Sequence, residues 1–397
     1  MGKSLKGKEL GKGIRQRYNG LYDARAIING QEIHISNTNL KILKHEFNAL
    51  KKETSNGNTL VVKKYTLNEW FEQWFETYKI IQIKKSSVIP LKSKFRNIFG
   101  CLGNKNVQDI LNIDIQNVIN NYVSSGKNLN SLKSALSNLS ECFSIAIANK
   151  IVKENPCLAV SVPRNNNQRK SQELTFLTKE EENEFLKAAQ YQRGSLYGNW
   201  LYEAFYTLFY TGMRVSELCG LKWKDVNFRK KYISIERQLI CQYCKGKHMY
   251  FDTPKTQAGY RKIPFIGDME NILKQQYKKI SERKLQLGEK WQATEEEFSD
   301  LVFYSIKGTP LIKDTIAIAT KNIVNRINKD RIEYDKFKPV HPHMFRHSFA
   351  VKCYEHNIDL KTTQMLLGHS NFNTTMNIYT HISDNKLESE IIKFDVK

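Results

Sequence analysis

The stretch TGMRVSELCGLKW, residues 211–223, decides how the C-terminal part of this chain folds. It follows a predicted helix that spans about residues 197–210. Gly212 ends that helix, because glycine readily adopts the left-handed conformation of a helix C-cap. Arg214 comes two residues later. The stretch therefore predicts a helix end that is followed closely by an arginine.

The sequence on both sides of this stretch predicts a mainly helical domain. Thr178 and Glu181 have the spacing of a capping box and stand ahead of a helix in EEENEFLKAAQ, residues 180–190. Downstream, three β-rich runs predict one small antiparallel sheet. They are KKYISIERQLI (230–240), HMYFDTPKT (248–256) and YRKIPFI (260–266). The remaining residues have helical patterns, so residues 176–397 are expected to form one domain.

The middle of the chain is expected to be all helical. From residue 65 onward, apolar side chains recur at three- and four-residue steps and predict a buried helix face. They are Leu67, Trp70, Phe71, Trp74, Phe75 and Tyr78. Further helices are predicted over 113–123 and 131–151. A polar, basic run at 161–175, SVPRNNNQRKSQELT, is typical of a linker, so the helical domain is placed at residues 66–165.

Residues 1–65 are predicted to form a separate small β-sheet with one helix. The pairs at 19–20 and 29–30 are Asn-Gly, the strongest short hairpin signal, and they separate strands at 13–18, 21–28 and 31–36. A helix follows at 39–53. Together the three domains give a multidomain α+β fold.

This N-terminal domain is strongly basic, with 13 Lys and Arg against 5 Asp and Glu, a net charge of +8. Arg15 and Arg17 share one face of the first strand, and Arg25 lies on the second strand. We expect these arginines to contact DNA. The alternative is that they form only the solvated face of a small sheet.

Composition favours a nucleic-acid partner. The chain has 62 Lys and Arg against 40 Asp and Glu, a net charge of +22 and a pI near 9.5. Seven scattered cysteines, an odd number, indicate reduced thiols. The sequence begins without a signal peptide and contains no apolar run long enough to span a membrane. A cytoplasmic DNA-binding protein without a membrane partner is expected.

Five stretches in order resemble the tyrosine recombinase family. They are TGMRVSELCGLKW (211–223), TPKTQAGYRKIP (253–264), HPHMFRHSFA (341–350), LLGHSNFNTT (366–375) and NIYTH (377–381). The catalytic candidates that this resemblance supplies are Arg214, Lys255, His343, Arg346, His369 and Tyr379. Residues 1–65 look like the arm-site DNA-binding domains of phage and conjugative-transposon integrases.

The resemblance implies DNA cleavage through a covalent phosphotyrosine, with Tyr379 as the nucleophile and His343 as a candidate base. Arg214 and Arg346 suit phosphate, because a guanidinium binds two oxygens at once and stays charged. His369 would donate a hydrogen bond to a non-bridging oxygen. Lys255 would act as the general acid that protonates the 5′-oxygen leaving group. Rejoining by a partner DNA, in two rounds, passes through a Holliday junction.

No cofactor is expected for this chemistry. The candidates are not accompanied by an acidic cluster with metal-ligand spacing, and the chain has no GxxxxGK[ST] phosphate loop. Cys241, Cys244 and His248 supply only three of the four ligands of a structural zinc site, so free thiols are the preferred interpretation.

Each candidate also has a purely structural interpretation. Arg214 could simply form an ion pair with Glu217, and His343 could be a buried histidine. Lys255 is placed in a hairpin with Lys245, Lys247 and Lys262, any of which could only touch phosphate. The neighbouring His341, His347 and His381 are left as structural or phosphate contacts.

The resemblance further implies partners and leaves rival functions open. An apolar face of Leu387, Ile391 and Phe394 in the C-terminal tail could dock on a neighbouring protomer, which favours a homotetramer in the synaptic complex with double-stranded DNA. An excisionase or a host DNA-bending protein is a further expected partner. The alternatives are a type IB topoisomerase-like enzyme, a chromosome-dimer resolvase and a non-catalytic DNA-binding regulator. The N-terminal domain favours an integrase of a mobile element.

Overall fold

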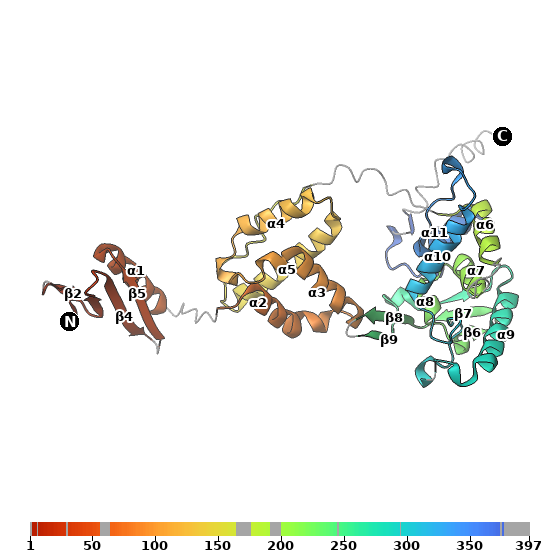
Figure 1. The fold of residues 1–397 in the computed structure, drawn as a ribbon, viewed down its shortest axis with the longest axis horizontal. Coiled ribbons are helices and arrows are strands. Elements are labelled where there is room, and N and C mark those ends of the chain that lie inside the picture. The colour runs from red at the N-terminus through yellow and green to blue at the C-terminus, as the bar shows by residue number, and fades with distance from the viewer. Residues whose placement is uncertain are drawn as a thin grey trace. The chain divides into compact units, whose positions relative to one another are not determined.

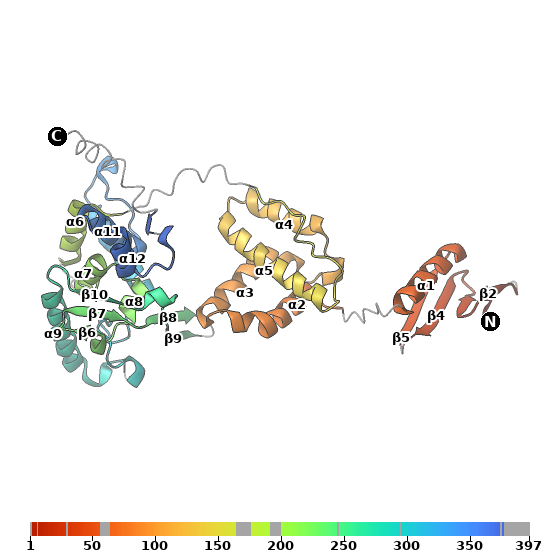
Figure 2. The ribbon, with the colours of Figure 1, turned by 180° about the vertical axis from the view of Figure 1, so that it is seen from behind.

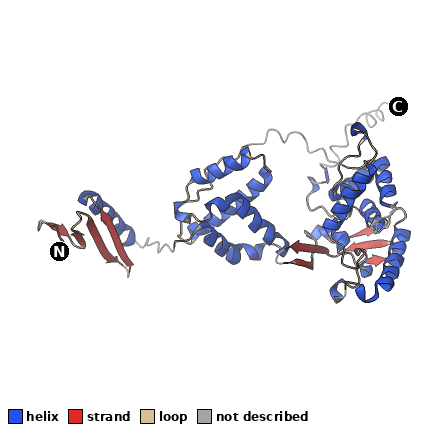
Figure 3. Cartoon of the chain, viewed as in Figure 1, coloured by secondary structure: helices blue, strands red, loops and turns tan. Residues whose placement is uncertain are grey.

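A computed structural model describes residues 2–5, 7–28, 31–55, 64–163, 176–190, 200–243, 246–293, 295–373 and 375–376. The chain divides into two compact units, Met1–Arg164 and Asn165–Lys397. Helices dominate both, with small sheets in each (Figure 3). Among the helices described, none is both long and apolar enough to cross a membrane.

The first unit begins with a sheet that is covered by a helix on one face (Figure 1). Antiparallel strands β3 (Ile14–Gln16), β4 (Tyr22–Ile28) and β5 (Gln31–Asn37) precede α1 (Leu40–Ser55), which confirms the predicted order. Alternate residues of the strands face α1 and bury Ile14 and Ala24 against Leu43 and Phe47. Two short strands that were not predicted, β1 (Gly2–Lys3) and β2 (Glu9–Gly11), come first.

The rest of the first unit is helical (Figure 2). Its main helices are α2 (Leu67–Trp74), α3 (Lys85–Phe99), α4 (Asn112–Ser124) and α5 (Leu129–Ala148), with short helical turns at Phe75–Lys79, Ile80–Gln82, Gly100–Leu102 and Val107–Asp109. The apolar stripe that begins at Leu67 is the core of this part, as predicted, with only Tyr78 partly exposed. Helix α3 was not predicted. It contains Pro90, which weakens a helical pattern.

The second unit combines helices with two small sheets. Its α-helices are α6 (Lys179–Gln190), α7 (Tyr202–Thr211), α8 (Val215–Cys219), α9 (Met269–Leu287), α10 (Lys313–Ile327), α11 (Pro342–Glu355) and α12 (Leu360–Leu367). Its strands are β6 (Val226–Asn227), β7 (Tyr232–Ile235), β8 (Gln238–Tyr243), β9 (Lys247–Asp252) and β10 (Arg261–Pro264). The capping box at the start of α6 is present, since Thr178 and Glu181 bond reciprocally at 2.8 and 3.3 Å.

The prediction of a single sheet in this unit was wrong. Strand β7 pairs with β10 and β6, whereas β8 and β9 form a separate two-stranded hairpin. Residues 236–237 interrupt the predicted strand at 230–240, so its two halves pair with different partners. The β-rich composition identified the strands but not their pairing.

An aromatic cluster holds α11 in place. Phe345 contacts Phe185 of α6 and Phe205 and Phe209 of α7, with ring centroids 4.8–5.6 Å apart. All four side chains are fully buried. Packing of Phe345 therefore fixes the position of the next residue, Arg346.

Candidate active site

Arg214 is positioned by the end of α7. Gly212 is the C-cap of α7 at φ 58°, and a side chain there would also meet Phe349, whose Cδ1 lies 2.5 Å from an ideal Cβ. The chain turns at this glycine and Arg214 becomes the N-cap of α8. The predicted helix end followed by an arginine is confirmed.

Glu217 holds two arginines at once. Its Oε1 accepts a 2.6 Å bond from Nη1 of Arg214, and its Oε2 accepts a 2.8 Å bond from Nη2 of Arg261. The Glu217 side chain is 1% exposed. Burial alone raises the pKa of this carboxyl, but Arg261 and then Arg214 outweigh burial and hold the pKa below its ordinary value. The predicted ion pair between Arg214 and Glu217 is therefore present. It uses only part of the guanidinium, so other N–H groups of Arg214 remain for other partners.

Three consecutive carbonyls at the end of α12 each accept a bond from a different arginine. The Leu366 oxygen accepts from Arg261 Nε at 2.6 Å, and the Gly368 oxygen accepts from Arg214 Nη2 at 3.3 Å. Between them, the Leu367 oxygen accepts from Nη2 of Arg346. We call these three oxygens the carbonyl row. The row brings together arginines from three separate quoted stretches.

Arg261 was not singled out from the sequence. It lies in the stretch 253–264, from which only Lys255 was predicted as a catalytic residue. Its side chain is 5% exposed and bonds the carbonyl oxygen of Gly259 as well as Glu217. No local sequence pattern indicates such burial, because its partners lie 44 and 105 residues away.

Arg346 is buried under the site. It is 4% exposed, and its Nη1 donates a 2.8 Å bond to the carbonyl oxygen of Gly212. Burial, followed by the nearby charges of Arg214 and Arg261, lowers the pKa of Arg346. Protein acceptors offset the positive charge of these arginines only in part. The remaining charge favours the binding of an anion.

His369 directly follows the carbonyl row. Its Nδ1 lies 2.8 Å from Oγ1 of the buried Thr375. Burial, then the charges of Arg346, Arg214 and Arg261, lowers the pKa of His369 to about 3. The imidazole is therefore neutral at physiological pH.

His343 lies in the first turn of α11 and lines a pocket of about 300 Å³ with Arg214 and Arg346. Ser216, Lys313 and Asp314 also line this pocket. His343 is exposed, so its interpretation as a buried histidine was wrong. Partial desolvation, followed by the charge of Arg346, lowers the pKa of His343 and favours the neutral form, which can accept a proton.

Lys255 and Tyr379 are placed differently. Lys255 is exposed in the loop between β9 and β10. Because those strands belong to different sheets, the predicted hairpin around Lys255 was wrong. Tyr379, His381 and the apolar tail residues lie outside the described residues. The structure thus brings together Arg214, His343, Arg346 and His369.

The cysteine and histidine of the β8–β9 hairpin do not converge. Cys241 pairs with Met249 and is buried, whereas the adjacent pair, Gln242 with His248, points to the opposite face. Cys244 lies outside the described residues.

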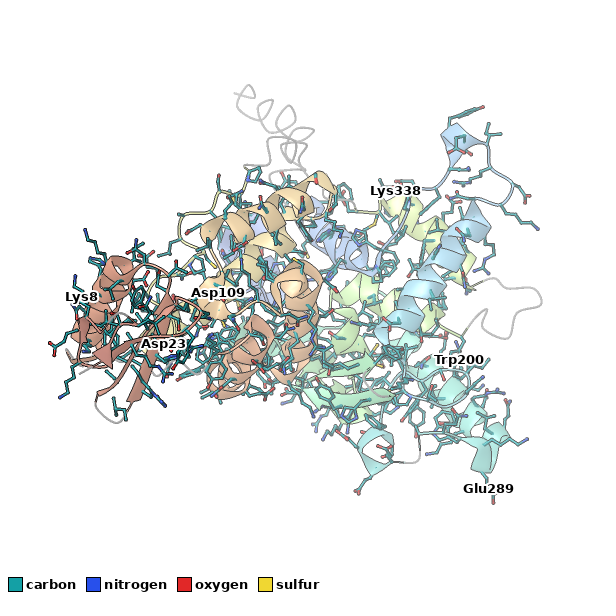
Figure 4. The ribbon with its side chains drawn as sticks, turned by 60° about the vertical axis from the view of Figure 1, so that its left-hand side comes forward. Lys8, Asp23, Asp109, Trp200, Glu289 and Lys338 are labelled. Carbon is teal, nitrogen blue, oxygen red and sulfur yellow. The ribbon has the colours of Figure 1, made fainter. Side chains whose placement is uncertain are left out.

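The arginines predicted to bind DNA lie on the face of the N-terminal sheet opposite α1. Arg15 and Arg17 both donate through Nε to Oδ2 of Asp23, at 3.4 and 2.5 Å, and Arg25 pairs with Glu32. Asp23, labelled in Figure 4, is buried and also accepts a 2.7 Å bond from Ser36. The Ser36 hydroxyl and then Arg17 lower the pKa of Asp23 to about 2. The three arginine side chains remain 45–72% exposed.

The carbonyl row thus gathers Arg214, Arg261 and Arg346 beside the neutral His369 in a mainly helical domain. The model of the phage integrase family matches residues 175–386, and that of the phage integrase N-terminal SAM-like domain matches residues 66–122.

Several curated relatives cover most of the chain. A XerC-like tyrosine recombinase of Caldanaerobacter subterraneus subsp. tengcongensis is 29% identical over 85% of this chain and 86% of its own length. The transposase of transposon Tn916 from Enterococcus faecalis is 24% identical over 88% of this chain and 82% of its own length. The ICEBs1 integrase of Bacillus subtilis is 27% identical over 73% of this chain and 72% of its own length.

Solved structures share the fold. The Tn1549 transposon integrase in complex with transposon right end DNA has a TM-score of 0.65 at 22% identity, over 84% of this chain and 100% of that one. A lambda integrase tetramer bound to a Holliday junction has a TM-score of 0.54 at 22% identity, over 94% of this chain and 95% of that one.

The chain belongs to the phage integrase family. It is a site-specific DNA recombinase of the tyrosine recombinase type, like its relatives from conjugative transposons and phages.

Proposed function

We propose that this chain is the integrase of a mobile genetic element and cuts DNA through Tyr379. The tyrosine oxygen attacks the scissile phosphorus, a 3′-phosphotyrosyl bond forms, and the 5′-oxygen leaves as a hydroxyl. A 5′-hydroxyl of the partner DNA then attacks the adduct and releases the tyrosine. Two such rounds exchange both strand pairs through a Holliday junction. The observation that carries this proposal is that Arg214 and Arg346 meet at the carbonyl row, which His369 directly follows.

The arginines would stabilise the charge of the transition state. A phosphodiester gains negative charge as the nucleophile adds, so preorganised donors lower the barrier. Arg214 and Arg346 are held by backbone carbonyls and by Glu217 before any substrate arrives. They need not reorganise when DNA binds. His369, neutral and half-buried, would add a hydrogen bond to a non-bridging oxygen.

The nucleophile needs help to lose its proton. A tyrosine with an ordinary pKa of about 10 is ionised in about one molecule in a thousand at neutral pH, a handicap of about 4 kcal/mol. His343 is exposed in the pocket beside Arg214 and Arg346 and is neutral, which suits a general base. The positive charge of the two arginines also favours the tyrosinate.

Lys255 is proposed as the general acid. The 5′-oxygen leaves slowly unless a proton reaches it, and the exposed ammonium of Lys255 has no ion-pair partner within the described parts of the chain. No metal ion enters this scheme, because the arginines supply the positive charge and Lys255 the proton. ATP is not needed either, because the phosphotyrosine keeps the energy of the broken bond.

The chain is proposed to work as three domains at residues 1–65, 66–165 and 176–397. The first unit contains two separate hydrophobic cores, one under the N-terminal sheet and one among α2–α5. The sheet would contact arm sites through Arg15, Arg17 and Arg25, and the other two domains would bind the core site. A homotetramer would assemble on double-stranded DNA in the cytoplasm, with an excisionase or a host DNA-bending protein directing excision.

A strand-exchange assay in EDTA without nucleotide tests the proposal. Supercoiled plasmids that carry two copies of the element end should recombine, and plasmids without the site should remain supercoiled. Relaxation of any plasmid regardless of sequence would instead support a type IB topoisomerase. Binding without cleavage would support a non-catalytic regulator.

A further inference from the structure

Thr375 makes a side-chain contact with one ring nitrogen of His369. Its Oγ1 lies 2.8 Å from Nδ1 of His369, and the residue is completely buried. The quoted stretch 366–375 contains this threonine, but the proposed function gives it no role.

Only one tautomer of His369 suits its proposed role. A neutral imidazole has one N–H donor and one acceptor nitrogen. Because Nδ1 is occupied by Thr375, Nε2 is the nitrogen left for substrate. Nε2 can donate to a phosphate oxygen only when it carries the proton, and then Nδ1 must accept a bond from the hydroxyl of Thr375.

The surroundings keep His369 in the neutral state in which this choice matters. Burial, followed by the charges of Arg346, Arg214 and Arg261, disfavours a second proton on the ring. A doubly protonated histidine would donate from both nitrogens and would need no partner of defined direction. Burial and these arginines, two of which are proposed to bind phosphate, therefore create the need for a residue that selects the tautomer.

We propose that Thr375 is a positioning residue, which donates its hydroxyl proton to Nδ1 of His369 and so makes Nε2–H a hydrogen-bond donor to the scissile phosphate. This inference rests on the proposed role of His369. Thr375 itself does not touch the DNA.

A double-mutant cycle on full-length protein tests the proposal, with single-turnover cleavage of a nicked suicide substrate as the readout. Thr375→Val should slow cleavage about tenfold and leave core-site affinity unchanged, because one oriented hydrogen bond is lost. Thr375→Ser keeps the hydroxyl and should cleave within about threefold of wild type. His369→Ala should be slow, and adding Thr375→Val to it should change nothing further, because Thr375 acts only through His369.

Three results separate the possible failures. If Thr375→Val slows the His369→Ala protein as much as it slows wild type, Thr375 has a packing role and the inference is wrong. Cleavage at the wild-type rate by the Thr375→Val variant also overturns the inference. If His369→Ala cleaves normally, the proposed role of His369 fails first, and this inference falls with it.

A second readout does not depend on activity. The ring ¹⁵N resonances of His369, assigned by their loss in His369→Ala, should show a protonated Nε2 and an unprotonated Nδ1 in the wild-type protein. Thr375→Val should shift them toward a mixture of tautomers. A protonated Nδ1 in the wild-type protein contradicts the proposal.

Discussion

Arg261 and Glu217 form an ion pair of 2.8 Å in which the two side chains are only 5% and 1% exposed. Glu217 also binds Arg214, so the pair couples the scaffold of the site to an arginine proposed to bind phosphate. Arg261 reaches the carbonyl row as well, through Leu366. The proposed chemistry thus depends on a buried ion pair that does not itself bind DNA.

Arg261→Met should destabilise the catalytic domain by about 3 kcal/mol, because one partner of a buried charge is removed while Arg214 still holds the other side of Glu217. Urea unfolding monitored by circular dichroism measures the change. The exposed Arg229 offers a matched control, and Arg229→Met should unfold like wild type. Equal stability of both variants would show that the Arg261–Glu217 pair contributes nothing.

The buried carboxylate of Asp23 predicts a pH dependence in the N-terminal sheet. Its pKa is lowered to about 2, chiefly by Ser36 and then Arg17, so its stabilising effect is complete above the ordinary aspartate pKa near 4. That effect should disappear as the pH falls from about 4 to about 2. Hydrogen exchange of residues 22–28, corrected for intrinsic rates, should show protection falling over this range.

Asp23→Asn provides the control for this pH effect. In that variant, protection of the same strand should already be reduced at neutral pH and should change less between pH 4 and pH 2. If wild type and Asp23→Asn lose protection in parallel, another group, such as Glu32 in its pair with Arg25, is responsible.

Lys255→Ala should cleave a normal substrate slowly but a 5′-bridging phosphorothiolate substrate at nearly the wild-type rate. Sulfur leaves without a proton, so the general acid becomes dispensable. Lys262→Ala is a suitable control, since Lys262 of β10 lies over the ring of Tyr232 on β7 and this variant should show the same ratio of rates as wild type. Equal slowing of both substrates by Lys255→Ala would mean that Lys255 only contacts phosphate.

Removal of the N-terminal domain should abolish arm-site binding and spare core-site cleavage. The deletion should end at residue 63, because Tyr65 packs on Trp70 and accepts a 3.0 Å bond from the amide of Val107. All six catalytic candidates remain. Integration of a complete element end should become inefficient, because bridging two DNA segments raises the effective concentration of the second contact. Equal affinity of both proteins for every segment, by gel shift, would exclude an arm-binding role.

Local signals in the sequence predicted much of the fold. The Asn-Gly pairs placed the strands of the N-terminal sheet, and the stripe from Leu67 placed the helical core. Gly212 correctly ended α7. The predicted strand pairing in the second unit was wrong. Strands β8 and β9 pair with each other, and residue composition does not specify which strands pair.

The site was predicted less completely than the fold. Arg214, Arg346 and His369 were identified through short motifs, but the arrangement of the two arginines depends on carbonyls 154 and 21 residues away. Arg261 and Thr375 have ordinary local sequences, and only burial and long-range hydrogen bonds distinguish them.

The central claim is that Tyr379 forms the covalent bond to DNA, and trapping that bond tests it most directly. Wild-type protein mixed with a nicked suicide core site should form an SDS-resistant adduct, and peptide mapping should locate the phosphodiester on Tyr379. Tyr379→Phe lacks only the nucleophilic oxygen, so it should bind the site with wild-type affinity and form no adduct. An SDS-resistant adduct formed by Tyr379→Phe would contradict the account.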